Sequence, residues 1–151
     1  MIAVDTNILL YAHRAEVPWH KPALAAMMRL VLADEPWGIP WPCVHEFVGI
    51  ATHPRIYAPP STLAQAFGAM DAWLASRHCR LLGEGTGYWE EFKRLALQAN
   101  ISGPLTHDAR IAALCLHHGV REFWTHDRDF NRFPRLKARN PLVGNQIGIG
   151  G

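Results

Sequence analysis

Short apolar runs alternate along this chain with longer segments in which apolar residues recur every three or four positions. This alternation constrains the fold more than any other feature, because strands separated by helices form parallel sheets with helices on both faces. The strand-like runs cover residues 2–5, 37–41, 79–82 and 121–125, with a last short one expected near 135–139. The sequence therefore predicts an α/β fold with a mostly parallel central sheet.

Helical spacing marks the segments between these strands. We expect helices over residues 6–11, 19–33, 42–53, 61–77, 86–99 and 108–118. Thr6 or Asn7 is expected to cap the first of them. The fourth should bury one face, and the fifth should point Trp89 inward. The expected buried face consists of Leu63, Phe67, Met70 and Leu74.

The length of the chain favours one domain. A chain of 151 residues can build a single sizeable core. We expect residues 1–142 to form this domain and residues 143–151, which include four glycines, to be a flexible Gly-rich tail. No apolar run approaches the ~20 residues that span a bilayer, and the first residues lack the pattern of a signal peptide. We therefore expect a cytoplasmic protein with no membrane partner.

Acidic residues stand where the predicted strands end. Asp5 ends the first strand, and Asp127 follows the strand at 121–125, with Asp129 two positions later. Glu46 is expected in the first turn of the helix after the second strand, and Asp108 at the start of a later helix. In a parallel sheet these positions share one edge. Carboxylates gathered there repel one another, and a divalent cation such as Mg²⁺ relieves the repulsion. The pattern predicts a metal-dependent hydrolase.

Two polar neighbours support this interpretation. Thr125 lies two positions before Asp127, and Asn7 two positions after Asp5, so each is expected on the same side as its acid. Both side chains can orient a carboxylate or a metal-bound water. The alternative is purely structural, because Asp108 also suits a helix start and Asp5 a turn.

Histidine and cysteine offer competing metal ligands. His45, His107 and His126 each directly precede one of the acids, which would fit a zinc site. Adjacent residues point in different directions, however, so histidines next to converging acids should face away. The three cysteines are widely spaced, without a C-x-x-C pair, and we expect buried reduced thiols.

Basic residues cluster after the last acids. The net charge of +2 is too small to indicate nucleic-acid binding by itself. Five cations nevertheless fall within twelve residues, namely Arg128, Arg132, Arg135, Lys137 and Arg139. This segment is either an edge that contacts phosphates or a solvated basic surface.

Four segments, in this order and at these spacings, resemble the PIN-domain ribonucleases, specifically the VapC-type toxins of bacterial toxin–antitoxin pairs. The segments are Val4-Asp5-Thr6-Asn7, Val44-His45-Glu46-Phe47, His107-Asp108-Ala109-Arg110-Ile111-Ala112-Ala113 and Trp124-Thr125-His126-Asp127-Arg128-Asp129-Phe130. The stretch from Arg132 to Leu142 is also similar to members of that group, so the resemblance covers nearly all of the chain up to Leu142.

The resemblance implies a single PIN-like, Rossmann-like domain that cleaves RNA endonucleolytically with Mg²⁺ or Mn²⁺. It implies Asp5, Glu46, Asp108 and Asp127 as the catalytic, metal-binding acids, with Asp129 as a fifth. It further implies a homodimer that a cognate antitoxin holds inactive.

We add the hypothesis that three arginines of the basic segment, Arg128, Arg132 and Arg135, contact the RNA. The alternatives are a related metal-dependent nuclease or phosphatase with another substrate, and an inactive interaction module whose acids only cap helices.

Overall fold

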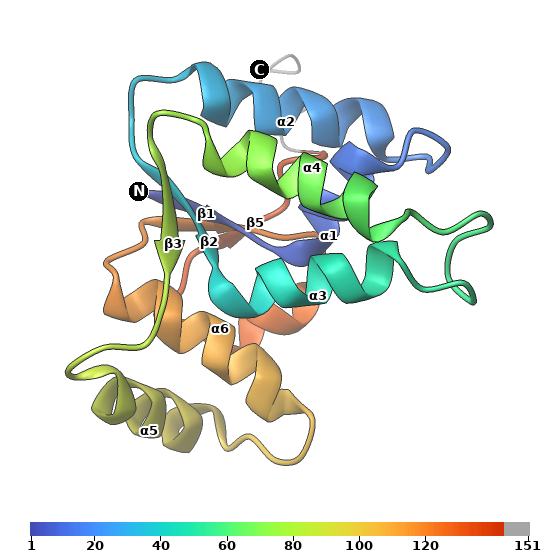
Figure 1. Cartoon of the computed structure of the whole chain (residues 1–151). Helices are drawn as coiled ribbons and strands as arrows, with labels where there is room; N and C mark the ends of the chain where they lie inside the picture. Colours follow the sequence, from blue (N-terminus) through green and yellow to red (C-terminus); the bar gives the residue numbers. More distant parts are fainter. Residues whose placement is uncertain (144–151) are drawn as a thin grey trace.

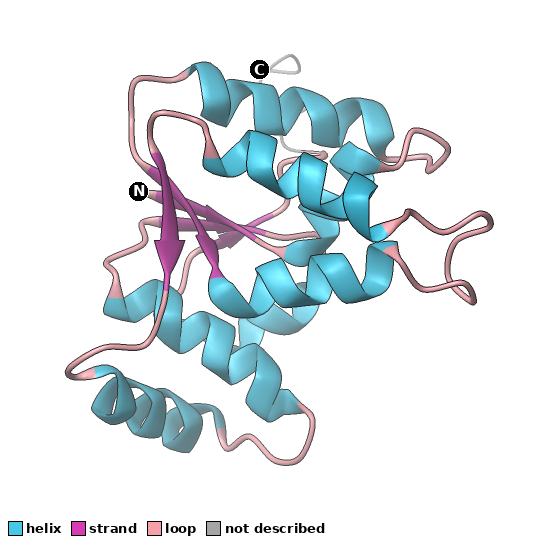
Figure 2. Ribbon diagram, in the orientation of Figure 1, coloured by secondary structure: helices cyan, strands magenta, loops and turns pink. Residues whose placement is uncertain are grey.

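The computed structural model describes residues 1–143, and the predicted Gly-rich tail lies, from residue 144 on, outside the described residues. Its centre is a five-stranded sheet in the order β3-β2-β1-β4-β5, and all four strand pairings are parallel (Figure 2). The strands are β1 (Ile2–Val4), β2 (Trp37–Pro40), β3 (Cys79–Leu82), β4 (Glu122–Trp124) and β5 (Ala138–Arg139). The predicted α/β class is confirmed, and the sheet is wholly parallel.

Helices cover both faces of this sheet, as predicted. They are α1 (Thr6–His13), α2 (His20–Leu32), α3 (Trp41–Ala51), α4 (Leu63–Leu74), α5 (Tyr88–Ala99) and α6 (Leu105–His117), followed by the 3-10 helix η1 (Arg128–Arg132). Figure 1 shows α2 and α4 on one side of the sheet and α5 and α6 on the other. None of the helices in residues 1–143 combines the length and the apolar character needed to cross a membrane.

The strand order places a switch point at β1. The chain runs from β1 outward to β2 and β3, and then returns to the other side of β1 to form β4 and β5. Val4 pairs with Trp124, so the residues that follow them, Asp5 and Thr125, leave the sheet side by side. The Asp5 amide donates to the Trp124 carbonyl at 2.9 Å. Open α/β sheets build their sites at such a crevice, outside the carboxyl ends of the strands.

The central strands carry apolar side chains that are buried in the core. Ala3, Val4, Ile39 and Phe123 are fully buried. Gly38 is closely packed, because a Cβ there would lie 3.0 Å from the buried Leu82 side chain and 3.2 Å from the Arg80 carbonyl oxygen. The strands β1, β2 and β4, which precede Asp5, the helix of Glu46 and Asp127 in the chain, are therefore packed closely together.

The predicted inward faces of α4 and α5 are partly wrong. On α4, Met70 is buried, whereas Leu63 and Phe67 are 55% and 51% exposed. On α5, Leu95 is buried and Trp89 is 58% exposed. Each helix buries one narrow stripe, since α4 contacts α3 and α5 contacts α6 at the outside of the helical layers. Apolar spacing alone overestimates the width of such a stripe.

The helix starts also differ from the prediction. Asp5 itself caps α1, since its carboxylate accepts from the Thr6 amide at 2.8 Å, and neither Thr6 nor Asn7 has that role. Helix α6 begins at Leu105, so Asp108 is its fourth residue rather than its cap. Glu46 is the sixth residue of α3, one turn later than expected. The acids on α3 and α6 are thus placed within these helices and do not cap them.

Candidate active site

A cleft of about 200 Å³ opens at the carboxyl edge of the sheet, and all four predicted acids line it. Asp5 follows β1, Glu46 lies on α3, Asp108 on α6, and Asp127 in the loop after β4. The fold thus brings four acids from four separate segments of the chain to one place. The rest of the wall consists of the polar Thr6 and Asn7 and the apolar Leu10, Ile50, Ile111 and Phe130.

Asp5 lies at the bottom of this cleft and is 5% exposed. Its carboxylate accepts from the Thr125 hydroxyl at 2.7 Å and from the Thr6 amide at 2.8 Å, and the Cys43 thiol lies 3.6 Å away. Burial raises the pKa of Asp5 from its usual 3.8 to about 6, the donors from Thr125 and Thr6 partly oppose the rise, and the charge of Glu46 adds to it. The fold thus fixes this carboxylate while disfavouring its charge.

Glu46 is exposed but has a fixed partner. The Thr6 hydroxyl, from the first residue of α1, donates to Glu46 Oε2 at 2.9 Å across forty positions of sequence. This bond links the start of α1 to the middle of α3. It sets the direction in which the Glu46 carboxylate enters the cleft.

Asp108, Asp127 and Asp129 form the tightest acidic group among residues 1–143. One carboxylate oxygen from each lies within 4.8 Å of the others. The pKa of Asp108 is raised first by burial and then by the negative charges of Asp127, Asp129 and Glu46, with a partial opposing effect of Arg132. Asp129, which the sequence offered only as a fifth acid, therefore belongs to this closely spaced group. Such a group of like charges attracts a divalent cation.

The donor set fits Mg²⁺ or Mn²⁺ rather than zinc. Carboxylate oxygens suit these hard cations, whereas zinc sites in proteins draw mainly on histidine and cysteine. No histidine of the described chain lines the cleft. His126 instead packs its ring against Tyr11 and Trp19, at 5.8 and 5.1 Å between ring centroids, and His45 stacks on Trp41.

Thr125 and Asn7 connect the two halves of the site. The Thr125 hydroxyl donates to Asp5 and accepts from the Asp127 amide at 2.9 Å. The Asn7 side-chain nitrogen lies 3.4 Å from both Asp5 Oδ2 and Thr125 Oγ1, and its oxygen accepts from the His126 amide at 3.2 Å. Both residues were predicted from the sequence as partners of the acids, whereas the contacts of Thr6 and Cys43 with the acids were not.

Replacing Thr125 by Val is expected to destabilise the protein by ~1–3 kcal/mol, because the buried Asp5 carboxylate and the Asp127 amide lose their partner. Denaturant unfolding at pH 7 measures this loss. Thr125→Ser keeps the hydroxyl and is the matched control, with an expected loss well below that of the Val variant. Equal stability of the Val variant and the wild type would contradict this role of the hydroxyl.

The basic segment divides into paired and unpaired cations. Arg135 pairs with Glu91 on α5 at 2.8 Å, and Lys137 and Arg139 both pair with Glu122. Arg132 lies 3.9 Å from Asp129 beside the acids. Arg128 alone in this segment has no ion-pair partner among the residues that the structure describes.

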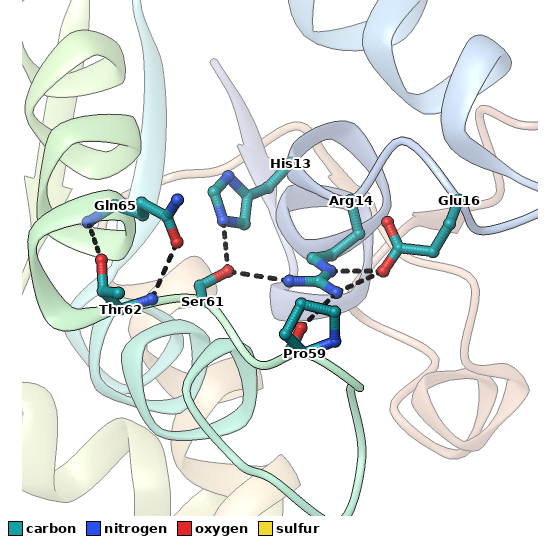
Figure 3. A network of polar contacts seen from close by, with 7 residues as sticks. All are labelled: His13, Arg14, Glu16, Pro59, Ser61, Thr62 and Gln65. Atoms are coloured by element: carbon teal, nitrogen blue, oxygen red, sulfur yellow. Dashed lines mark hydrogen bonds and ion pairs between the residues drawn. The ribbon is translucent and has the colours of Figure 1, made fainter.

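A second polar network braces the far end of α1 (Figure 3). The buried Ser61 hydroxyl lies 2.9 Å from His13 Nε2 and accepts from Arg14 at 3.1 Å. Arg14 also donates to the Pro59 carbonyl at 2.8 Å and lies over the Tyr57 ring. These contacts tie the segment before α4 to α1, the helix that carries Asp5 and Thr6 at its start. The cavity beside them is separate from the acidic cleft.

Comparison with known proteins decides the family. A family model for the PIN domain matches residues 2–136. The VapC ribonuclease Mb2897 of Mycobacterium bovis is 35% identical, over 95% of this chain and 97% of its own length. The chain belongs to the VapC ribonucleases of the PIN-domain family.

Solved structures of this family share the fold described above. VapBC2 from Rickettsia felis, bound to a DNA fragment from its promoter, contains a chain with a TM-score of 0.68 at 18% identity, covering 93% of this chain and 98% of that one. VapC20 of Mycobacterium tuberculosis, a toxin that cleaves the sarcin–ricin loop, gives 0.63 at 16% identity, with coverage of 87% and 93%. At these identities the likeness concerns the fold.

Proposed function

We propose that this VapC ribonuclease is a divalent-metal-dependent endoribonuclease and acts as the toxin of a toxin–antitoxin pair. The observation that supports this most strongly is the convergence of Asp5, Glu46, Asp108 and Asp127 in one cleft at the carboxyl edge of a PIN-type sheet. Membership of the VapC ribonucleases supports RNA as the substrate.

In this proposal the four acids hold Mg²⁺ or Mn²⁺, and Asp129 is an additional ligand from the exposed side. A bound divalent ion lowers the pKa of a water and stabilises charge on the leaving oxygen of a phosphodiester. Thr6 and Thr125 orient Glu46 and Asp5 through the hydrogen bonds given above, as supporting partners of metal ligands do. No histidine lines the described cleft to serve as a separate general base.

Arginines of the basic segment are proposed to hold the RNA beside the acids. Arg132 and Arg128 lie on η1, next to Asp127 and Asp129, and phosphate groups are their natural partners. Arg135 remains a predicted contact, although its pairing with Glu91 makes it the least available of the three.

A cognate antitoxin and a second copy of the chain are the proposed protein partners. Several of the solved structures that share this fold are complexes of VapC with VapB or of the related FitAB pair. Binding of an antitoxin over the acidic cleft would block access of RNA to it.

The substrate class can be tested with a panel offered in the same Mg²⁺ buffer. We expect cleavage of RNA within the chain, little cleavage of single-stranded DNA, and no release of phosphate from a phosphomonoester. Excess chelator should abolish RNA cleavage. Hydrolysis of the phosphomonoester or of DNA at a rate equal to that of RNA would support the alternative hydrolases named above instead.

A further inference from the structure

A second polar cavity lies directly behind the acidic cleft. Its volume is about 250 Å³, and the residues around it come from the loop after β4, from η1 and from the end of β5. Asp127 lines both the cavity and the cleft, so the two hollows adjoin at the loop after β4. A ligand in the cavity would lie beside Asp127, one of the four acids of the cleft.

The cavity has a fixed wall. His126 Nδ1 lies 3.0 Å from the Asn140 side-chain nitrogen, and Asn140 Oδ1 accepts from the Leu142 amide at 3.0 Å. The His126 ring is also held by Tyr11 and Trp19 on its other side. These contacts fix the side chains of this wall, which lowers the cost of ordering them when a ligand binds.

Two side chains around the cavity are free to bind. Arg128 is exposed. The other four cations of the basic segment form ion pairs, whereas Arg128 forms none with the described residues. Asn131, one turn along η1, is exposed, and its side chain makes no hydrogen bond with any described residue. Arg139 also lines the cavity, but its guanidinium pairs with Glu122 at 3.2 Å. An anion with a hydrogen-bonding edge matches these groups.

We propose that this cavity binds one nucleotide of the RNA, next to the bond that is cleaved. Arg128 binds its phosphate, and the Asn131 amide, which offers both a donor and an acceptor, reads the edge of its base. Proteins recognise single-stranded RNA in this way, by holding unstacked bases on polar side chains. The inference rests on the proposed ribonuclease function and adds a site that selects where the RNA is cut.

The test measures RNA binding without cleavage. Four single-stranded RNA decamers, each of one base, are bound to the full chain in excess chelator and followed by fluorescence anisotropy at several salt concentrations. Arg128→Gln should weaken binding of all four about tenfold and reduce the slope of log affinity against log salt by about 0.7. Arg121→Gln, which removes an exposed charge at the opposite end of β4, is the control and should change neither.

Asn131→Ala should have a different signature. We expect it to reduce the differences in affinity among the four decamers and to leave the salt slope unchanged, whereas Gln98→Ala, which removes an exposed amide on α5, should alter neither. The same Asn131 variant should shift the positions of cleavage in a long RNA with Mg²⁺ present.

Several results would overturn the proposal. One is an equal effect of Arg128→Gln and Arg121→Gln on RNA affinity and on its salt dependence. The others are unchanged differences in affinity among the four decamers in Asn131→Ala, and no binding of any decamer at low salt. Binding of a polyglutamate peptide, but not of RNA, through Arg128 would assign the cavity to an acidic protein segment. If the decamers bind as expected but no RNA is cleaved with Mg²⁺, the proposed ribonuclease function fails and the nucleotide site stands.

Discussion

Asp108→Asn is expected to lower RNA cleavage by more than ~100-fold while leaving the fold intact. Loss of partners that only support a metal ligand already reduces metal affinity or activity by ~10–100-fold, and loss of a ligand should exceed that. Asp108 is the cleanest of the four acids to replace, because its carboxylate makes no hydrogen bond with a described residue. Asn has the same shape, so the substitution removes mainly the charge. Initial rates of RNA cleavage in saturating Mg²⁺ measure the effect.

The control for this experiment is Asp71→Asn, an exposed acid on α4 outside the acidic cleft. It changes the net charge by the same amount and should cleave RNA like the wild type. The Asp108 variant should also unfold at the same or higher denaturant concentration in chelator, since burial and its acidic neighbours disfavour the charged form. A fully active Asp108→Asn protein would rule out this carboxylate as a member of the site.

Divalent metal is expected to stabilise the protein strongly at pH 7.5 and much less at pH 5. This expectation follows from the raised pKa values of Asp5 and Asp108. For Asp5 the rise from 3.8 to about 6 means that the fold favours the protonated over the charged carboxyl by ~3 kcal/mol. The folded, metal-free protein binds these protons more tightly than the unfolded chain does. The contribution of Asp5 to stability is therefore fully present below pH 4 and is lost as the pH rises through about 6, and the contribution of Asp108 changes in the same direction.

Above that pH the buried carboxylates are charged and uncompensated, and a bound cation restores the loss. Mn²⁺ at a hundredfold excess over its dissociation constant should contribute ~2.7 kcal/mol, which for a protein of this size raises the Tm by roughly 5–10 °C. At pH 5 protons compete for Asp5, so we expect less than about half of that rise.

Thermal unfolding with and without Mn²⁺ at both pH values, at constant ionic strength, measures this dependence. Asp108→Asn should lose most of the rise at pH 7.5, whereas Asp71→Asn should keep it. A rise in Tm of the same size at both pH values, or in both variants, would show that the ion acts elsewhere than on these acids.

The sequence was sufficient to predict the edge of the sheet at which the site lies. Asp5 and Asp127 follow apolar runs short enough to be buried strands, and parallel strands end together, so their convergence follows from the alternation alone. The strand Cys79–Leu82 and the C-terminal Gly119 of α6, at a φ of 68°, were likewise predictable from local patterns.

The contacts within the site were not predictable in the same way. The bonds from Thr6 to Glu46 and from Cys43 to Asp5 join residues about forty positions apart, and their existence depends on how α1 and α3 pack. The start of α6 was misplaced because Leu105-Thr106 carries no cap signal of its own. Trp89 was expected inside because periodicity cannot show that α5 lies on the outer side of α6.

Calorimetric titration of Mn²⁺ into the metal-free protein tests the central claim most directly, since it measures the metal site without reference to any RNA. We expect saturable binding to the wild type and to Asp71→Asn at pH 7.5, and binding to Asp108→Asn that is weaker by more than ~10-fold. Binding of equal affinity to all three proteins, or no binding to the wild type, would contradict a metal centre built from these acids.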